Sequence, residues 1–275
     1  MSVNFEEQFL LMLIPYDRMV DAYEEGHPQW GHPKPPEPIK NADVWEKAVR
    51  EDIKKISQTK VGSLLLRSIK HYGKAVAMLT HLTANCNSIT QPGYEVGTGA
   101  DIVFNPDTYK IGGTCANKYI RMGGFHIESH EILLHELVHA FRKVSGKEKT
   151  TYLGKGLIFY DDNEDFNAVL VQGIYASELR KPIRASHFRH FEINKELNGS
   201  LKFFKSSSDA FKYVEKFCLE NPGFTKGFIN INTHFNPINA YYQDREIARQ
   251  FSRSAFARGL DVITPIVANL VNGKL

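Results

Sequence analysis

The sequence predicts an α+β fold, and three observations support this prediction. Segments with the apolar spacing of helices come first along the chain, segments typical of strands follow, and a second helix-rich part comes last. The composition, with 42% hydrophobic and 24% charged residues, is that of a globular protein. A length of 275 residues is enough for one sizeable core, or for one core and a smaller lobe.

The first forty residues predict a helix followed by an extended arm. Residues 3–24 carry apolar residues at helical spacing, but Pro15 interrupts them and permits at most a kinked helix. Residues 26–38 contain five prolines, which favour an extended surface arm. We therefore expect residues 1–40 to be peripheral to the main core.

The next part of the chain alternates between helical and strand patterns. Two segments have helical spacing, residues 42–58 and 62–72, whereas β-type runs occupy 75–79, 85–92, 97–106 and, more briefly, 119–122. The Gly97-Thr98-Gly99 segment is not followed by Lys-Ser/Thr and does not open a helix, so we interpret it as a strand entry and reject a phosphate loop.

The sequence His135-Glu136-Leu137-Val138-His139 is an H-E-x-x-H motif. On a helix, His135 and His139 lie about 40° apart and one turn above each other, so both imidazoles can meet one metal ion. Zn²⁺ takes nitrogen ligands in tetrahedral geometry. Glu136 lies about 100° round the helix from His135, where its carboxylate can reach a zinc-bound water.

The residues around the motif predict the helix independently of any metal. An apolar stripe accompanies the histidine face, formed by Leu134, Leu137, Val138 and Phe141. We expect Ser129 as the N-cap, Glu131 in the first turn and Gly146 as the stop. Glu131 and Glu128 are either partners of an imidazole N–H or solvated acids of the first turn.

A catalytic zinc site requires a third protein ligand and an open position. The H-x-x-G-x-x-H continuation is excluded, because Arg142 occupies the glycine position. We expect Glu164 to be the third ligand, in the first turn of a following helix that Asp162 or Asn163 caps. The acidic residues Asp161, Asp162 and Asp165 compete for this role.

Charge and cysteine usage narrow the class of protein. The formal net charge of +3 is too close to balance to indicate nucleic-acid binding. Cys86, Cys115 and Cys218 are widely spaced and odd in number, which favours reduced thiols. The apolar run 9–14 is too short to span a bilayer and lacks the features of a secretory signal peptide.

These residues resemble the zinc metallopeptidases of the M91 family, which are bacterial type III secreted effectors. The similarity covers roughly residues 90–190, about a third of the chain. It rests on four segments: the strand entry 97–106, the helix 132–140, Glu164 with Ala168-Val169 behind it, and the Leu-Arg…Pro-x-Arg segment that ends at Arg184. The family pattern has Arg-x-x-Tyr after the third ligand, whereas this chain has Arg184-x-x-His187.

The resemblance implies a zincin-like fold, in which the edge strand of a small mixed sheet lies beside the metal helix. It also implies an endopeptidase with Zn²⁺ as cofactor, made in the bacterial cytoplasm and delivered to the host cell cytosol. A protein or peptide substrate would bind in extended form. We expect a monomer with no nucleic-acid or membrane partner.

We therefore expect a catalytic core over residues 41–200 and a helical C-terminal subdomain over 201–275. In this hypothesis His135, His139 and Glu164 bind zinc, and Glu136 is the general base. Arg184, or failing that His187 or Tyr175, stabilises the oxyanion. The alternatives are a non-proteolytic zinc hydrolase and a zinc-stabilised interaction protein.

Overall fold

The computed structural model describes residues 11–17, 37–38, 40–80, 88–93, 98–149, 162–185, 187, 192–206 and 209–257. The chain divides into two compact units, residues 1–148 and 149–275. The boundary between these units falls inside the expected catalytic core of residues 41–200. The expected division by function, into 1–40, 41–200 and 201–275, therefore stays a prediction.

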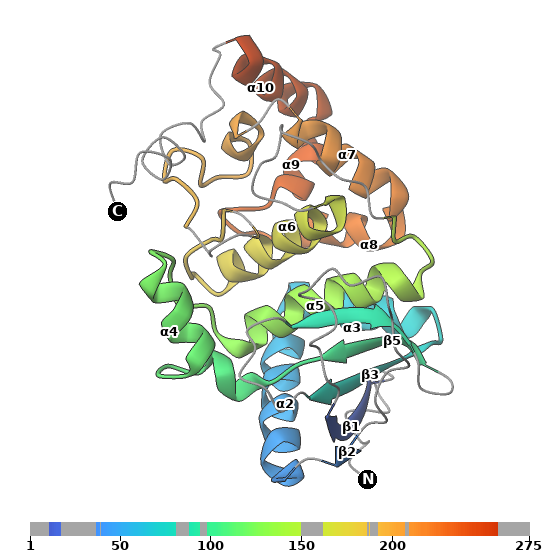
Figure 1. Cartoon of the computed structure of the whole chain (residues 1–275). Coiled ribbons are helices and arrows are strands. Elements are labelled where there is room, and N and C mark those ends of the chain that lie inside the picture. The colour runs from blue at the N-terminus through green and yellow to red at the C-terminus, as the bar shows by residue number, and fades with distance from the viewer. Residues whose placement is uncertain are drawn as a thin grey trace, which may run out of the picture. The chain divides into compact units, whose positions relative to one another are not determined.

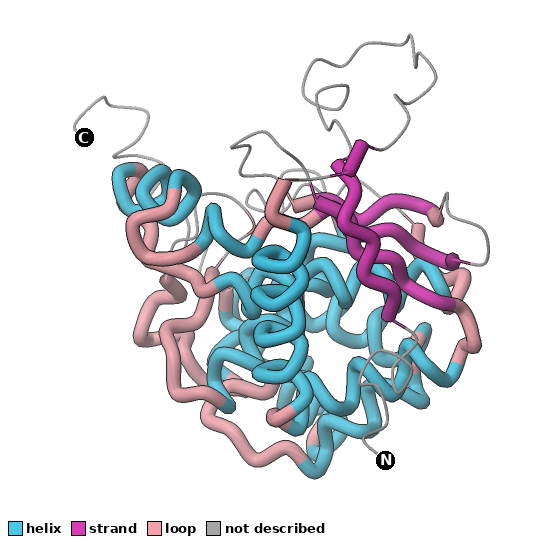
Figure 2. Tube along the Cα trace, turned by 90° about the horizontal axis from the view of Figure 1, so that it is seen from below, coloured by secondary structure: helices cyan, strands magenta, loops and turns pink. Residues whose placement is uncertain are grey.

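The first unit contains one mixed five-stranded sheet with the strand order β2-β1-β3-β5-β4. Its strands are β1 (Leu11–Asp17), β2 (Glu37–Pro38), β3 (Ala75–Thr80), β4 (Ile89–Pro92) and β5 (Thr98–Val103). The inner strands β1, β3 and β5 are parallel, whereas the edge strands β2 and β4 pair antiparallel to their neighbours. Figure 2 shows these strands side by side as one twisted layer. The strands and the helices occupy separate stretches of the chain. The prediction of an α+β fold is therefore confirmed.

Strand β3 lies at the centre of the sheet, and its residues are apolar except for Thr80 at the end. Residues 76–80 are all buried, as expected for a parallel strand that is covered on both faces. Its register with β5 pairs Val76 with Ala100 and Met78 with Ile102. The prediction of a strand over residues 75–79 is therefore confirmed.

The prediction of a kinked helix over residues 3–24 is wrong for residues 11–17, which form strand β1, and the rest of that range lies outside the described residues. Its pairing with β3 shifts register between Leu13 and Asp17, on either side of Pro15. Proline cannot donate a ladder hydrogen bond, so a strand accommodates it at such an irregularity. The helical spacing of the apolar residues was therefore misleading, and pairing with β3 decided the conformation.

Helices α2 (Ala42–Ser57) and α3 (Lys60–His71) confirm the two early helix predictions. Helix α2 buries Trp45, Val49, Ile53 and Ile56 along one face. The Trp45 indole N–H donates to the Phe104 carbonyl at 3.0 Å, which fastens α2 to the end of β5. Between the two helices, the Thr59 hydroxyl accepts from the Gly62 amide at 2.9 Å and caps α3.

The segment after β5 is helical rather than extended. A 3₁₀ turn, η1 (Pro106–Tyr109), follows the strand at the Pro106-Asp107 pair, as is common for turn residues. Helix α4 (Thr114–Arg121) then includes most of residues 119–122, so the prediction of a strand there is wrong. Gly112 and Gly123 have positive φ at the two ends and mark the turns without indicating what lies between them. Cys115 on α4 is disulfide-bonded, which corrects the expectation that all thiols are reduced.

Helix α5 (Ser129–Val144) carries the H-E-x-x-H motif and packs on β4, β5, α2 and α3 (Figure 1). Gly146 follows it with a φ of 66°, as expected for a residue that ends a helix. The end of α5 approaches β5 closely at Gly99. A Cβ at Gly99 would lie 2.9 Å from Val144 Cγ1, so this glycine permits the strand and helix to pack, as the strand-entry interpretation implies.

The second unit is mainly helical in its described part. Its elements are α6 (Asn163–Glu178), η3 (Lys202–Lys205), α7 (Ala210–Glu220), α8 (Pro222–Thr225), η4 (Lys226–Asn230), α9 (Pro237–Gln243) and α10 (Arg245–Ala257). Its core is aromatic: Phe166, Phe203, Phe204, Phe211, Phe217, Phe224, Phe228 and Phe235 are buried. The apolar tail expected over residues 261–271 lies outside the described residues.

No helix in the described part of the chain is both long enough and apolar enough to span a bilayer.

Candidate metal centre and active site

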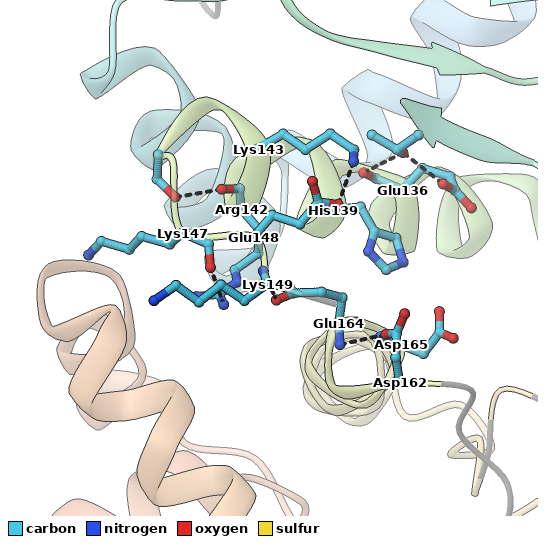
Figure 3. Close-up of polar contacts among 12 residues, drawn as sticks. Glu136, His139, Arg142, Lys143, Lys147, Glu148, Lys149, Asp162, Glu164 and Asp165 are labelled. Carbon is cyan, nitrogen blue, oxygen red and sulfur yellow. Dashed lines mark hydrogen bonds and ion pairs between the residues drawn. The ribbon is translucent and has the colours of Figure 1, made fainter. Parts of the chain in front are cut away.

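Helix α5 carries the three residues of the motif, of which Figure 3 shows Glu136 and His139. His135 is only 3% exposed, and Glu136 is also buried. The Nε2 atoms of His135 and His139 lie 3.1 Å apart, and their ring centroids are separated by 4.9 Å. The helix therefore aims both imidazoles at one point, as the i, i+4 spacing predicted.

This arrangement of the imidazoles fits a zinc ion. Two tetrahedral ligands with Zn–N bonds of about 2.0–2.1 Å would place their nitrogens roughly 3.3 Å apart. The observed 3.1 Å between the two Nε2 atoms is close to that separation. The same distance fits a hydrogen bond between one Nε2–H and the other Nε2, and two imidazole nitrogens at this spacing also suit a shared metal.

Thr90 on the edge strand β4 holds the Glu136 carboxylate. Its hydroxyl lies 2.7 Å from Glu136 Oε2 and 3.1 Å from the Glu136 carbonyl oxygen, with the carboxylate as the closer acceptor. This contact fixes the orientation of the carboxylate beside the histidines. Sequence reasoning missed Thr90, because the two residues are 46 positions apart and no local pattern links them.

Tyr109 adds a second hydroxyl group near this carboxylate. It is buried, and its hydroxyl lies 3.1 Å from Ser88 Oγ. Burial raises the pKa of Tyr109 well above its usual range, with the nearby Tyr119 and Glu136 acting in the same direction and Ser88 opposing them. Tyr109 therefore keeps its proton at neutral pH and remains a hydrogen-bond donor.

Arg142, which excludes the H-x-x-G-x-x-H continuation, fastens the end of α5. Its guanidinium is buried and donates to the Lys147 carbonyl at 2.6 Å. The Arg142 carbonyl in turn accepts the amides of Lys147 and Glu148. An ion pair between Lys143 and Glu148 closes the same turn (Figure 3). Arg142 therefore has a structural role at the position where an H-x-x-G-x-x-H motif has its glycine.

The start of α5 differs by one residue from the prediction, because Glu128 and not Ser129 is the N-cap. The Glu131 carboxylate accepts the Glu128 amide at 3.1 Å, as in a capping box. Glu128 itself accepts from His130 Nε2 at 3.0 Å. Glu131 is buried, so it is not the solvated acid that we considered.

Glu128, His130 and Glu131 also form a group with metal-ligand atoms within 4.8 Å of one another. They surround the positive end of a helix, and Lys55 Nζ lies 4.0 Å from Glu128 Oε2. Both features oppose a divalent metal ion held between these three side chains. We therefore assign these three residues to capping and not to metal binding.

Glu164 belongs to the second unit and lies in the first turn of α6, as predicted. It is only 3% exposed. Its Oε1 accepts from the Lys149 amide at 3.1 Å and from Asn163 Nδ2 at 3.0 Å. Asp162 caps the helix by accepting the Glu164 amide at 2.8 Å (Figure 3). Neutral donors on one oxygen orient a carboxylate without neutralising it, which is a common arrangement for metal ligands.

Arg184, His187 and Asp165 form a connected group at α6 and the segment after it. Arg184 is 6% exposed, so it is not a solvated surface arginine. It donates to Gln172 Oε1 at 3.2 Å and to the His187 carbonyl. His187 Nδ1 lies 3.6 Å from Asp165 Oδ2. Tyr175, the third donor that we considered, is fully buried.

The structure therefore brings the predicted site residues together in two sets. His135, Glu136 and His139 form one set in the first unit. Glu164, Arg184 and His187 belong to the second unit. The convergence of Glu164 with the two histidines stays a prediction of the sequence.

Residues 37–170 match the model of a protein family described as Peptidase_M91, effector protein. The matched segment contains every strand of the sheet except β1, the H-E-x-x-H helix and Glu164. No curated protein and no solved structure matches the chain. Over this segment, the chain is similar to the Peptidase_M91 family of effector proteins, which agrees with the resemblance expected from the sequence.

Proposed function

We propose that this protein is a zinc-dependent endopeptidase that cleaves host proteins after its delivery as an effector. The observation that carries the proposal is the 3.1 Å separation of the two imidazole Nε2 atoms beside a buried glutamate. This geometry lies within the segment that matches the peptidase family. The family accounts for the peptidase class, whereas the geometry supports the choice of zinc.

In the proposed site, His135, His139 and Glu164 hold the metal. When bound, zinc supplies a water whose pKa is lowered to about 7 and polarises the scissile carbonyl. Glu136 accepts the proton of the attacking water and delivers it to the nitrogen of the leaving amine. Thr90 keeps the Glu136 carboxylate in one orientation through its bond to Oε2.

The edge strand β4 supports an extended binding mode for the substrate. Among the described strands, β4 pairs with β5 alone, and its Thr90 contacts the motif helix. An extended peptide can add to such an edge through backbone hydrogen bonds. We propose that the substrate chain pairs with β4 and so passes the Glu136 carboxylate.

The contacts in the second unit favour His187 over Arg184 as the donor to the developing oxyanion. The Arg184 guanidinium is buried against Gln172 and the His187 carbonyl, which suits a residue that positions the segment. The His187 side chain is 36% exposed and is paired with Asp165. A carboxylate partner on Nδ1 orients the imidazole through that contact.

A structural zinc is the main competing role, and it would require a fourth protein ligand. The other histidines closest to the motif in the sequence are His130, on the motif helix, and His126, just before it. His130 contacts Glu128 at 3.0 Å, and His126 donates to the Tyr109 carbonyl at 2.9 Å. These contacts favour a site with three protein ligands and one open position.

The test combines metal analysis with a comparison of cleaved proteins. The purified full chain and its Glu136→Gln form should each bind one zinc ion, measured by mass spectrometry of the metal. New protein termini should arise in a host-cell extract with the unmodified chain and be absent with Glu136→Gln. A chain without zinc, or a Glu136→Gln form that still cleaves, would contradict the proposal.

A further inference from the structure

We propose that a cleft beside the start of α5 binds the basic side chain, arginine or lysine, of a peptide segment. The cleft lies within the first unit and is formed by α2, η1 with the residues that follow it, and residues 126–129. It is separate from the histidines of the motif. The inference does not depend on the proposed peptidase activity.

The cleft has the shape of a site for one side chain. Its volume is about 300 Å³, at the lower end of the range for small-molecule sites. Three carboxylates line it, those of Glu51, Asp52 and Glu128. Its apolar wall contains Ala48, Pro106 and Ile111. An acidic floor with an apolar wall matches a side chain that has a methylene stem and a cationic head.

Asp52 is the residue that points most directly to a ligand. It is 4% exposed, and its Oδ2 atom has no hydrogen-bond partner among the described residues. Burial raises the pKa of Asp52 to about 6. The hydrogen bond from Ser129 and the charges of Lys55 and Lys110 lower this pKa, but their effect is smaller than that of burial. A buried carboxylate oxygen with no donor is costly unless something binds to it.

The charges around the cleft favour a cation. Lys110 Nζ lies 2.6 Å from Asp107 Oδ1, and Lys55 Nζ lies 4.0 Å from Glu128 Oε2, so each lysine has an acidic partner. The three carboxylates that line the cleft outnumber its two lysines, although both lysines also act on Asp52. His126 uses Nε2 as a donor to the Tyr109 carbonyl and does not supply an acceptor from that nitrogen.

The same surroundings argue for an organic cation and not for a metal ion. Two lysine side chains line the cleft and would oppose a divalent cation. Ile111 is 89% exposed at the cleft, an unusual position for a large apolar side chain. A methylene stem would cover it while the head group donates to Asp52 Oδ2. A free amino acid would bring its own carboxylate close to Glu51, so a residue within a peptide fits better.

The test uses the full chain in its Glu136→Gln form, so that no peptide is cleaved. The probes are acetylated and amidated Ala-Arg-Ala, the same peptide with lysine or citrulline, and free arginine. Binding is followed through the backbone amide NMR signals of residues 48–55 and 126–131. Asp52→Asn and Glu51→Gln are the test variants, and Glu220→Gln on α7 is the control with the same change of charge.

We expect the arginine or lysine peptide, or both, to shift these signals at millimolar concentration, with citrulline and free arginine binding more weakly. Asp52→Asn should weaken binding about tenfold or more, as for the loss of a charge-assisted hydrogen bond, and Glu51→Gln by less. Glu220→Gln should bind as the parent does. Equal binding of citrulline or free arginine, unchanged binding by Asp52→Asn in a folded variant, or no shift with either basic peptide would overturn the proposal.

Discussion

The hydroxyl of Thr90 lies 2.7 Å from Oε2 of Glu136 and joins the edge strand of the sheet to the motif helix. A carboxylate that acts as a general base needs a fixed orientation, because proton transfer requires hydrogen-bond distances. The contact also links the strand that we propose for substrate pairing with the residue that we propose as the base. Thr90 is therefore the first residue to test outside the motif.

Replacing Thr90 by valine keeps the branched shape and removes the hydroxyl. We expect kcat to fall by about 10- to 100-fold, the loss expected for one hydrogen bond to a charged group. Zinc content should stay at one ion per chain, because Thr90 does not contact the histidine nitrogens in the proposed site. The measurements are steady-state cleavage of an identified substrate and metal analysis.

Thr90→Ser is the matched control for this experiment. Serine retains the hydroxyl, so its activity should stay close to that of the unmodified chain. If Thr90→Val cleaves as fast as Thr90→Ser, the hydrogen bond does not orient the base. If Thr90→Val also loses zinc, the residue acts on the metal site as a whole.

Replacing Glu164 by glutamine should weaken zinc binding. The loss of a direct zinc ligand should lower the zinc affinity by more than the roughly 10- to 100-fold that is typical of residues that only hydrogen-bond to a ligand. Competition with a chelator of known affinity measures this change. Because Glu164 Oε1 also accepts the Lys149 amide, circular dichroism should establish that the variant remains folded.

Asp165→Asn is the control for the Glu164 experiment, since Asp165 is the adjacent acid and contacts His187. We expect this variant to retain zinc and to lose activity if His187 is the oxyanion donor. A chain that loses zinc with Asp165→Asn and keeps it with Glu164→Gln would assign the third ligand to Asp165.

Asp52 predicts a specific dependence of stability on pH. Burial raises its pKa in the folded chain from 3.8 to about 6, so its charged form is destabilised by folding. The stability that protonated Asp52 contributes to the folded chain is therefore fully present below the unfolded pKa of 3.8. It is lost as the pH rises through about 6, the folded pKa. Asp52→Asn, which carries no charge, should raise the thermal midpoint at pH 8 and have little effect at pH 4. An equal shift at both values would contradict this account.

The close packing around Gly99 predicts that a larger residue there would disturb the contact between β5 and α5. A Cβ at this position would lie 2.8 Å from Lys74 Cβ and 2.9 Å from Val144 Cγ1. We expect Gly99→Ala to destabilise the chain by about 1–3 kcal/mol, the usual range for overpacking. Adding Val144→Ala should recover part of the loss, and a double-mutant cycle of thermal or denaturant midpoints measures this coupling. Strictly additive effects would show that the two residues do not compete for the same space.

Strong local patterns predicted most helices and the main strands. The helices over 42–58 and 62–72, the motif helix and the helix of Glu164 all follow from apolar spacing and capping residues. The two errors, at residues 11–17 and 119–122, arose where local preference was weak. Pairing with β3 overrode the helical spacing around Pro15, and the turns at Gly112 and Gly123 did not specify what lay between them.

The sequence by itself determined the chemistry of the candidate site, because H-E-x-x-H places two imidazoles one helical turn apart wherever that helix lies. Only the tertiary structure decided that Thr90 holds Glu136, that Arg184 is buried, and that no described residue donates a hydrogen bond to Asp52 Oδ2. The physical reason is the separation along the chain between the residues that interact. Helix periodicity is set by neighbours within four residues, whereas these contacts join segments that are distant along the chain and meet only when the sheet and helices pack.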